Sequence, residues 1–184
     1  MVLVLYAHPY ADRSRANRAL VRALDGLPGV EVRALYERYP DFSIDVAAEQ
    51  AALARPRTIV VQHPLYWYAP PALLAMWCEK VLLHGWAFGE GGRALAGKRC
   101  LWAVTTGSPA EAYSAGGVHG ATLEDLALPL RRTMALCGVE WLAPFVLHGA
   151  RTQPRVELEL AAARYRERLA ALAARDARGG EAAP

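Results

Sequence analysis

Three segments of the chain gather side chains that can bind an anion, stack on a flat ligand or move a proton. The first is residues 7–17, AHPYADRSRAN, which holds His8, Ser14, Arg15 and Asn17. Ser14 stands directly before a helical pattern, and the start of a helix with extra hydroxyl, amide and guanidinium donors can bind a phosphate. The alternative is that Ser14 only caps the helix and Arg15 is a solvated charge.

The second segment is residues 62–71, QHPLYWYAPP, in which Tyr66, Trp67 and Tyr68 are consecutive. Neither a strand nor a helix can bury three neighbouring rings on one face, and the following prolines indicate a turn. We therefore expect at least one ring to line a cleft where a flat aromatic ligand can rest. The competing interpretation is that these large rings belong to the core.

The third segment is residues 105–120, TTGSPAEAYSAGGVHG, which follows an apolar run. Its first four residues include a glycine, which lets main-chain amides approach a ligand closely. Tyr113 and His119 lie in a glycine-flanked part with no apolar periodicity. A phenol and an imidazole together can donate and shuttle a proton near neutral pH. A single loop histidine is usually just solvated, but its pairing with Tyr113 favours a catalytic role.

Short apolar runs that alternate with helical patterns must position these segments. Five strands are predicted, at residues 2–7, 30–35, 58–61, 100–104 and 141–147. Five helices are predicted, at residues 14–24, 45–54, 72–83, 123–136 and 156–175. This alternation is typical of an α/β fold with a five-stranded parallel sheet and helices on both faces. Ligands of such sheets bind beyond the carboxyl ends of the strands, where all three segments begin.

Several boundaries can be predicted from single residues. Asp45 is placed to cap the helix that follows it, and Pro144 makes the last strand an edge strand. The helix at 123–136 should begin irregularly around Pro129. Residues 1–175 then form a single domain, and residues 176–184 are expected to be a frayed, flexible tail.

Composition excludes several classes of protein. The chain has 184 residues and a formal net charge of +3 without a basic block, which does not favour nucleic-acid binding. Cys78, Cys100 and Cys137 are far apart in apolar surroundings, which indicates free buried thiols in a reducing compartment and no metal cluster. Neither a signal peptide nor a membrane-spanning run is apparent, so a cytoplasmic protein is expected. The glycine fingerprint for dinucleotides and the Walker motif are also missing.

The residues of these segments carry a resemblance over nearly the whole chain. The chain resembles the flavodoxin-like NAD(P)H:quinone oxidoreductases, and within them the ancillary flavoproteins of bacterial glutathione-gated potassium-efflux systems. The stretches that match are YAHP (6–9), LYERYPDF (35–42), AAEQ (47–50), QHPLYWY (62–68), HGWAFG (84–89), LWAVTTG (101–107) and WLAPF (141–145).

The resemblance implies a homodimer that contains FMN rather than FAD and passes a hydride from NAD(P)H to a quinone. It implies a catalytic role in proton balance for Tyr113 and His119, although the tyrosine position can be phenylalanine in the potassium-system branch. No metal is expected, because the sequence has no Cys/His cluster. The resemblance implies that the flavin is held by His8, Ser14, Arg15, Ala16, Asn17, Leu65, Tyr66, Trp67, Tyr68, Thr105, Thr106, Gly107 and Ser108. Pro109 follows where the family usually has glycine, which should stiffen this loop.

Three functions remain open at this point. The first is an enzyme that reduces quinones by two electrons. The second is a regulatory subunit that binds and activates a membrane potassium-efflux transporter, with a mainly structural flavin, which would place the protein on the cytoplasmic face of the inner membrane. The third is a simple electron carrier, which is disfavoured because residues 85–97 and 106–120 are longer than a carrier needs.

Overall fold

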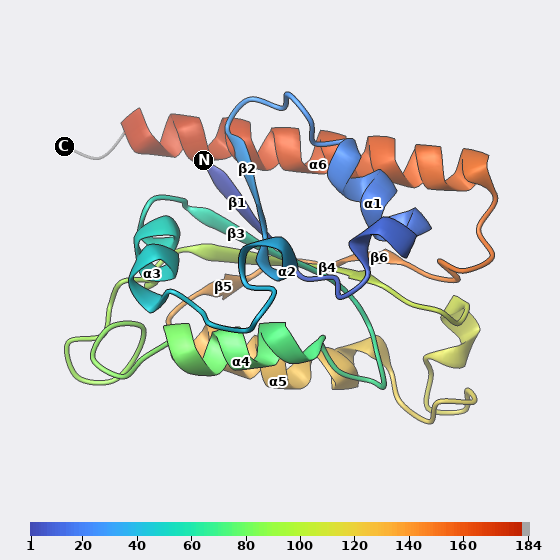
Figure 1. The fold of residues 1–184 in the computed structure, drawn as a ribbon, viewed down its shortest axis with the longest axis horizontal. Coiled ribbons are helices and arrows are strands. Elements are labelled where there is room, and N and C mark those ends of the chain that lie inside the picture. Colours follow the sequence, from blue (N-terminus) through green and yellow to red (C-terminus); the bar gives the residue numbers. More distant parts are fainter. Residues whose placement is uncertain (182–184) are drawn as a thin grey trace.

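The computed structural model describes residues 1–181 and contains one twisted parallel sheet (Figure 1). Its strands are β1 (Val2–Tyr6), β2 (Val30–Ala34), β3 (Thr58–Pro64), β4 (Arg99–Thr105), β5 (Glu140–Trp141) and β6 (Phe145–Leu147). The strand order is β2-β1-β3-β4-β5, and β6 also pairs with β4. Every pairing is parallel, which confirms the predicted flavodoxin-like fold class.

The predicted fifth strand is divided into two short pieces along the same edge of β4. β5 pairs with Arg99 and Cys100, and β6 pairs with Ala103 to Thr105. Pro144 lies between the pieces and has no N–H to donate to the ladder, which explains why the strand is interrupted there. The segment after β6 therefore emerges beside the segment after β4.

Helices cover both faces of the sheet. They are α1 (Arg15–Arg22), α2 (Leu35–Arg38), α3 (Val46–Ala54), α4 (Ala72–Val81), α5 (Leu123–Leu136) and α6 (Arg155–Glu181), with 3-10 turns at Ala11–Arg13 and Ala110–Ala112. In Figure 1, α1 and α6 lie on one side of the sheet and α4 and α5 on the other. The short helix α2 follows β2 directly and was not predicted from the sequence.

Alternation along the strands explains the two layers. In β1, Val2 and Val4 pack with residues of α1 and α6, whereas Leu3 and Leu5 pack with residues of α3, α4 and α5. Successive side chains of a strand point to opposite faces, so a central strand with apolar residues at every position is buried on both sides. The continuous apolar runs in the sequence are a direct consequence of this arrangement.

Helix starts follow the local sequence closely. Asp45 accepts a hydrogen bond from the Ala48 backbone N–H, which confirms the predicted cap of α3. The predicted irregular start of α5 at Pro129 is wrong, because α5 begins at Leu123 with a capping box between Thr122 and Asp125. These reciprocal hydrogen bonds satisfy the first free N–H groups and fix the start well before the proline.

The helix α6 extends beyond the predicted boundary. It is helical up to Glu181, so the tail expected from residue 176 is wrong for the described part, and residues 182–184 lie outside the described residues. Asp176 is buried and accepts hydrogen bonds from Arg99 and from the Thr58 hydroxyl, the latter at 3.1 Å. These contacts tie the last turns of α6 to the amino ends of β3 and β4.

A second buried carboxylate, Glu49 of α3, joins four elements. Its Oε1 accepts from Arg33 Nε at 2.7 Å and from the Tyr39 hydroxyl at 2.5 Å, and its Oε2 accepts from Trp77 Nε1 at 2.9 Å. Burial together with the Glu49 hydrogen bond raises the pKa of Tyr39. A buried charge with all its hydrogen bonds satisfied fixes the relative positions of its partners, here β2, the segment after α2, α3 and α4.

The three cysteines are free, and Cys100 and Cys137 are buried, in agreement with the sequence analysis. Burial raises the pKa of the Cys78 thiol to about 12. Among the described residues, no helix combines the length and apolar character needed to cross a bilayer.

Candidate active site

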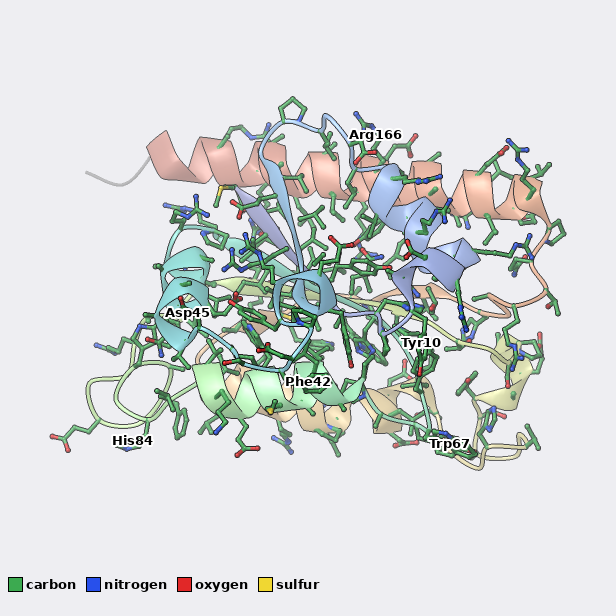
Figure 2. All side chains as sticks on the ribbon, in the orientation of Figure 1. Tyr10, Phe42, Asp45, Trp67, His84 and Arg166 are labelled. Atoms are coloured by element: carbon green, nitrogen blue, oxygen red, sulfur yellow. The ribbon has the colours of Figure 1, made fainter. Side chains whose placement is uncertain are left out.

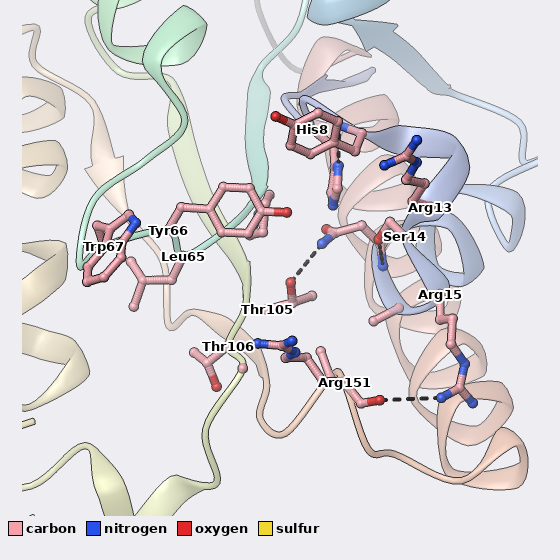
Figure 3. Close-up of a pocket in the computed structure, with 16 residues that line it drawn as sticks. His8, Arg13, Ser14, Arg15, Leu65, Tyr66, Trp67, Thr105, Thr106 and Arg151 are labelled. Carbon is pink, nitrogen blue, oxygen red and sulfur yellow. Dashed lines mark hydrogen bonds between the residues drawn. The ribbon is translucent and has the colours of Figure 1, made fainter. Parts of the chain in front are cut away.

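A cavity of about 600 Å³ opens at the carboxyl ends of the strands (Figure 3). All three segments singled out in the sequence contribute to it, together with the segment that follows β6. Its walls are formed by His8, Tyr10, Arg13, Ser14, Arg15, Ala16, Asn17, Pro64, Leu65, Tyr66, Trp67, Thr105, Thr106, Gly107, Ala150 and Arg151. The cavity thus lies at the edge of the sheet where parallel α/β sheets bind their ligands.

One end of the cavity is the start of α1. Ser14 is the N-cap, and its hydroxyl accepts a hydrogen bond from the Asn17 backbone N–H at 3.1 Å. Arg13 and Arg15 flank the cap, and Arg15 donates to the carbonyl of Gln153 at 3.1 Å. Since Ser14 satisfies only one of the first free N–H groups, the helix terminus and the guanidinium groups make this end electropositive and able to bind an anion.

His8 follows β1 and is almost fully buried at the same end. Its Nδ1 accepts a hydrogen bond from the Tyr10 backbone N–H at 3.0 Å, so the neutral ring carries its proton on Nε2. Burial lowers the pKa of His8. The ring is thus held as a neutral donor that lines the cavity.

Asn17 is buried at the floor of the cavity, where its side chain connects α1 to β3 and β4. Its Nδ2 donates to the Thr105 hydroxyl at 2.7 Å, and its Oδ1 accepts from Gln62 Nε2 at 3.3 Å. Gln62 in turn accepts from the hydroxyl of Tyr165 at 3.0 Å. This buried network connects α6, β3, α1 and β4, so Asn17 positions the helix start relative to the sheet.

The aromatic segment after β3 forms a tight turn at the other end of the cavity. Tyr66 and Ala69 exchange two backbone hydrogen bonds of 3.0 Å, and Trp67 and Tyr68 have φ of 48° and 64°. Two successive positive φ values are the signature of a type I′ turn, which usually contains Asn or Gly. The left-handed backbone holds the Trp67 side chain 92% exposed, beside the cavity that it lines (Figure 3).

The segment after β4 is held rigidly by the segment after β6. Thr106 N donates to the Leu147 carbonyl at 3.0 Å, Ala150 N donates to the Thr106 carbonyl at 2.8 Å, and Gly149 N donates to the Ser108 carbonyl at 2.9 Å. The amides of Gly107 and Ser108 make no such bond within the described chain. This leaves two main-chain donors in a fixed segment, and Gly107 lines the cavity.

Tyr68 and Ser108, both predicted to hold a cofactor, do not line the cavity but contact His119. The Tyr68 hydroxyl lies 3.2 Å from His119 Nδ1, and Ser108 Oγ lies 2.9 Å from His119 Nε2. The rings of Tyr113 and His119 are 4.6 Å apart between centroids. The predicted catalytic pair is therefore brought together in one polar cluster next to the segment after β4.

His148 was missed in the sequence and joins this cluster. Thr106 donates its hydroxyl proton to the Ser108 carbonyl at 2.8 Å, so the 3.0 Å contact between His148 Nδ1 and Thr106 Oγ1 must be donated by His148. Burial lowers the pKa of His148. His148 and Tyr113 also border a smaller cavity of about 380 Å³ between α5 and the edge of the sheet. Neither residue lines the main cavity.

Five further residues of the main cavity were missed, namely Tyr10, Arg13, Pro64, Ala150 and Arg151. Arg13 and Tyr10 lie within the first segment, so their positions alone could have suggested them. Ala150 and Arg151 follow β6, whose pairing with β4 is not apparent from the sequence.

A family model described as the flavodoxin-like fold matches residues 1–169. The chain is 48% identical to the glutathione-regulated potassium-efflux system ancillary protein KefF of Klebsiella aerogenes, over 92% of this chain and 94% of the relative.

Solved structures give a consistent picture of the fold. The general stress protein 14 of Treponema denticola, in complex with FMN, is 35% identical with a TM-score of 0.87 and covers 93% of this chain and 98% of its own. A NADPH-quinone reductase from P. pentosaceus is 26% identical with a TM-score of 0.83, covering 91% and 96%. A protein named as a thermophilic tryptophan halogenase from Streptomycin violaceusniger is 44% identical with a TM-score of 0.87, covering 90% and 96%. These proteins share one fold, but their names do not share one reaction.

Proposed function

Because the chain belongs to the family with the flavodoxin-like fold, we propose that it is an FMN-dependent NAD(P)H:quinone oxidoreductase. The observation that carries the proposal is the chemical difference between the two ends of the cavity. The start of α1 with Arg13 and Arg15 forms one end, and the aromatic side chains of Tyr66 and Trp67 with the free Gly107 amide form the other. FMN has a phosphate at one end and a flat ring system at the other.

The residues present fit this cofactor. The cavity volume lies in the range usual for small-molecule sites, roughly 300 to 1,000 Å³. Its lining contains three arginines and no carboxylate, which suits a phosphate of about −2 charge. In the proposed complex the start of α1, with His8 and Ser14, holds the phosphate. Tyr66, Trp67 and the Gly107 amide then face the ring system.

When bound, FMN would supply redox chemistry, taking a hydride from NAD(P)H to give NAD(P)⁺ and passing it to a quinone, which with one further proton becomes the hydroquinone. The protein's own residues supply positioning and protons. The cluster of Tyr113, His119 and Ser108 can hold and deliver a proton near the cavity, because a hydroxyl, an imidazole and a phenol are in contact there.

The direct test is turnover. The purified protein, loaded with FMN, should oxidise NADH or NADPH only slowly alone and rapidly when a soluble quinone is added, with one hydroquinone formed for each nucleotide consumed. A flavin-loaded protein that reduces no quinone with either nucleotide would contradict the proposal.

A second function is favoured by the 48% identity to KefF over nearly the whole of both chains. We propose that the protein also binds a potassium-efflux transporter and activates it, which would bring it to the cytoplasmic face of the inner membrane. The flavin could then be catalytic or mainly structural for that role.

The two roles can be separated by preventing flavin binding. A variant with His8→Ala and Asn17→Ala is expected to lose FMN. If this variant still activates potassium efflux in cells that carry the cognate transporter, activation does not need the redox reaction. If efflux falls with flavin content, the two roles are coupled. Far-ultraviolet circular dichroism should accompany the assay, because Asn17 also braces the fold.

We further propose a homodimer. Leu128 and Leu136 of α5 and Leu83 after α4 are exposed apolar residues in the layer that α4 and α5 form. Trp86 and Phe88, the aromatic residues of the loop at 85–97, are partly buried against the protein's own core. Exposed leucines of α5 are therefore better candidates for the centre of such an interface.

A further inference from the structure

Arg151 stands apart from the other two arginines of the cavity. Its main chain belongs to the anion-binding end, since its carbonyl accepts from Arg15 at 3.5 Å. Its side chain extends toward the segment after β4 and lies next to Gly107. Arg151 Cδ is 3.5 Å from the position that a Cβ atom on Gly107 would occupy. Figure 3 shows the guanidinium directed into the cavity beside Thr106, away from the start of α1. Arg151 therefore brings a positive charge to the aromatic end.

The charge of Arg151 has no anionic partner among the side chains that the structure describes. Among residues 1–178, whose side chains the structure describes, no salt bridge involves Arg13, Arg15 or Arg151, and the cavity lining contains no carboxylate. Arg13 lies beside the end proposed for the phosphate, where the helix terminus adds its own positive potential, and Arg15 donates to the Arg151 and Gln153 carbonyls. The third cation is thus not needed for the phosphate.

The charge of Arg151 already influences the pKa of Tyr66 at the aromatic end of the cavity. Burial raises the pKa of Tyr66, and Arg151 partly offsets this rise because its positive charge stabilises the phenolate. A group that acquires negative charge beside Tyr66 and Gly107 would be stabilised in the same way. Two-electron reduction by a hydride adds one negative charge to a flavin ring system unless a proton follows.

We propose that Arg151 favours the reduced over the oxidised form of the bound flavin, and so raises its midpoint potential. This inference rests on the proposed function of the site. A guanidinium is suited to the task because it stays protonated at all working pH values. Arg151 lines the cavity but is itself exposed, so water partly screens its charge and an effect of modest size is expected.

The test compares the FMN-loaded wild-type protein with Arg151→Gln, Arg151→Lys and Arg164→Gln. The last variant removes the same charge from an exposed position on α6. The midpoint potential is measured by spectrophotometric reduction against a reference dye, and the dissociation constants of oxidised and reduced FMN are measured separately. Michaelis constants for NADH and NADPH complete the set.

We expect Arg151→Gln to weaken the binding of reduced FMN about tenfold more than that of oxidised FMN, which lowers the potential by about 30 mV for a two-electron couple. Arg151→Lys should restore most of the potential, and Arg164→Gln should leave it unchanged. An unchanged potential in Arg151→Gln would overturn the inference while leaving the FMN site intact. An unchanged potential with a Michaelis constant raised for NADPH alone would assign Arg151 to the nucleotide phosphate instead. A wild-type protein that binds no FMN would overturn both this inference and the proposed function.

Discussion

Individual histidines in this protein have distinct roles because their environments differ. His63 is fully enclosed at the end of β3, where Nδ1 donates to the Pro64 carbonyl at 2.9 Å and Nε2 accepts from Trp102 Nε1 at 2.8 Å. Burial lowers the pKa of His63 to about 4. This ring is therefore a structural, neutral group, whereas His119 sits in a half-exposed polar cluster.

The buried state of His63 predicts a pH dependence of stability. Above pH 6.5 the ring is neutral in both the folded and the unfolded chain, so its titration does not change the free energy of unfolding. Between pH 6.5 and 4 the unfolded chain takes up a proton that the folded protein refuses, so the free energy of unfolding falls, by about 3 kcal/mol in total. Urea denaturation of wild type and His63→Asn over this range should show a smaller loss in the variant. A His63 ring that titrates near pH 6.5 by NMR would contradict this.

Tyr113 and His119 remain proposed catalytic residues, and the contacts of His119 suggest how to test them. Tyr113→Phe combined with His119→Ala should slow flavin reduction by NAD(P)H or quinone reduction by roughly 10²-fold or more, since proton transfer typically contributes that much. The flavin should stay bound, because neither side chain lines the main cavity. Unchanged rapid-mixing rates in both half-reactions would remove the pair from the mechanism.

At the scale of elements, the turn after β3 combines strain with exposure. Non-glycine residues in the left-handed region cost roughly 1–2 kcal/mol each, and Trp67 gains little in return because its side chain is almost fully exposed. Strain of this kind is retained where the turn serves a function, and here the turn borders the proposed ring site.

Trp67→Gly should therefore raise the free energy of unfolding by about 0.5–1 kcal/mol, because glycine adopts positive φ without strain but also loses more entropy on folding. The same change should weaken FMN binding by removing a ring from the cavity. Trp67→Phe keeps both the strain and a ring, and should resemble the wild type in urea denaturation and in flavin titration. A loss of stability in Trp67→Gly would show that the ring packs in the folded protein.

The elements also show what the sequence could predict. Fully apolar strands and capped helices were recognised because their signals are local, as with Ser14 and Asp45. The bounds of α5 were predicted as observed, but an irregular start was expected because Pro129 was given more weight than the Thr122 capping box. Arg151 and His148 were missed because they depend on β6 pairing with β4, which is a long-range contact. The type I′ turn at Trp67 was missed because its residues are not those that usually form it.

At the scale of the whole molecule, the cavity and the glycine loop lie at opposite ends. Figure 2 shows Tyr10 and Trp67 at one end and His84, which precedes the loop at 85–97, at the other. This loop thus does not cover the cavity of its own chain, although its length was one argument against a simple carrier. Any role it has in the site would involve a second copy of the chain.

The proposed homodimer predicts a specific dissociation. Leu128→Asp with Leu136→Asp should convert a dimer to a monomer in sedimentation velocity, because charges would be buried at an apolar interface. Val156→Asp provides a matched control, since Val156 is exposed on α6 in the opposite layer. A double variant that sediments like the wild-type dimer would place the interface elsewhere.

The central claim is that the cavity holds FMN with its phosphate at the start of α1. The most direct test is an equilibrium titration of the flavin-free protein with FMN and, separately, with riboflavin. Binding is measured by the quenching of flavin fluorescence. The account predicts one FMN per chain and binding of riboflavin at least about 100-fold weaker, since charge-assisted hydrogen bonds contribute roughly 1.5–3 kcal/mol each. His8→Ala should narrow that difference. Equal affinity for the two flavins, or binding of neither, would contradict the account.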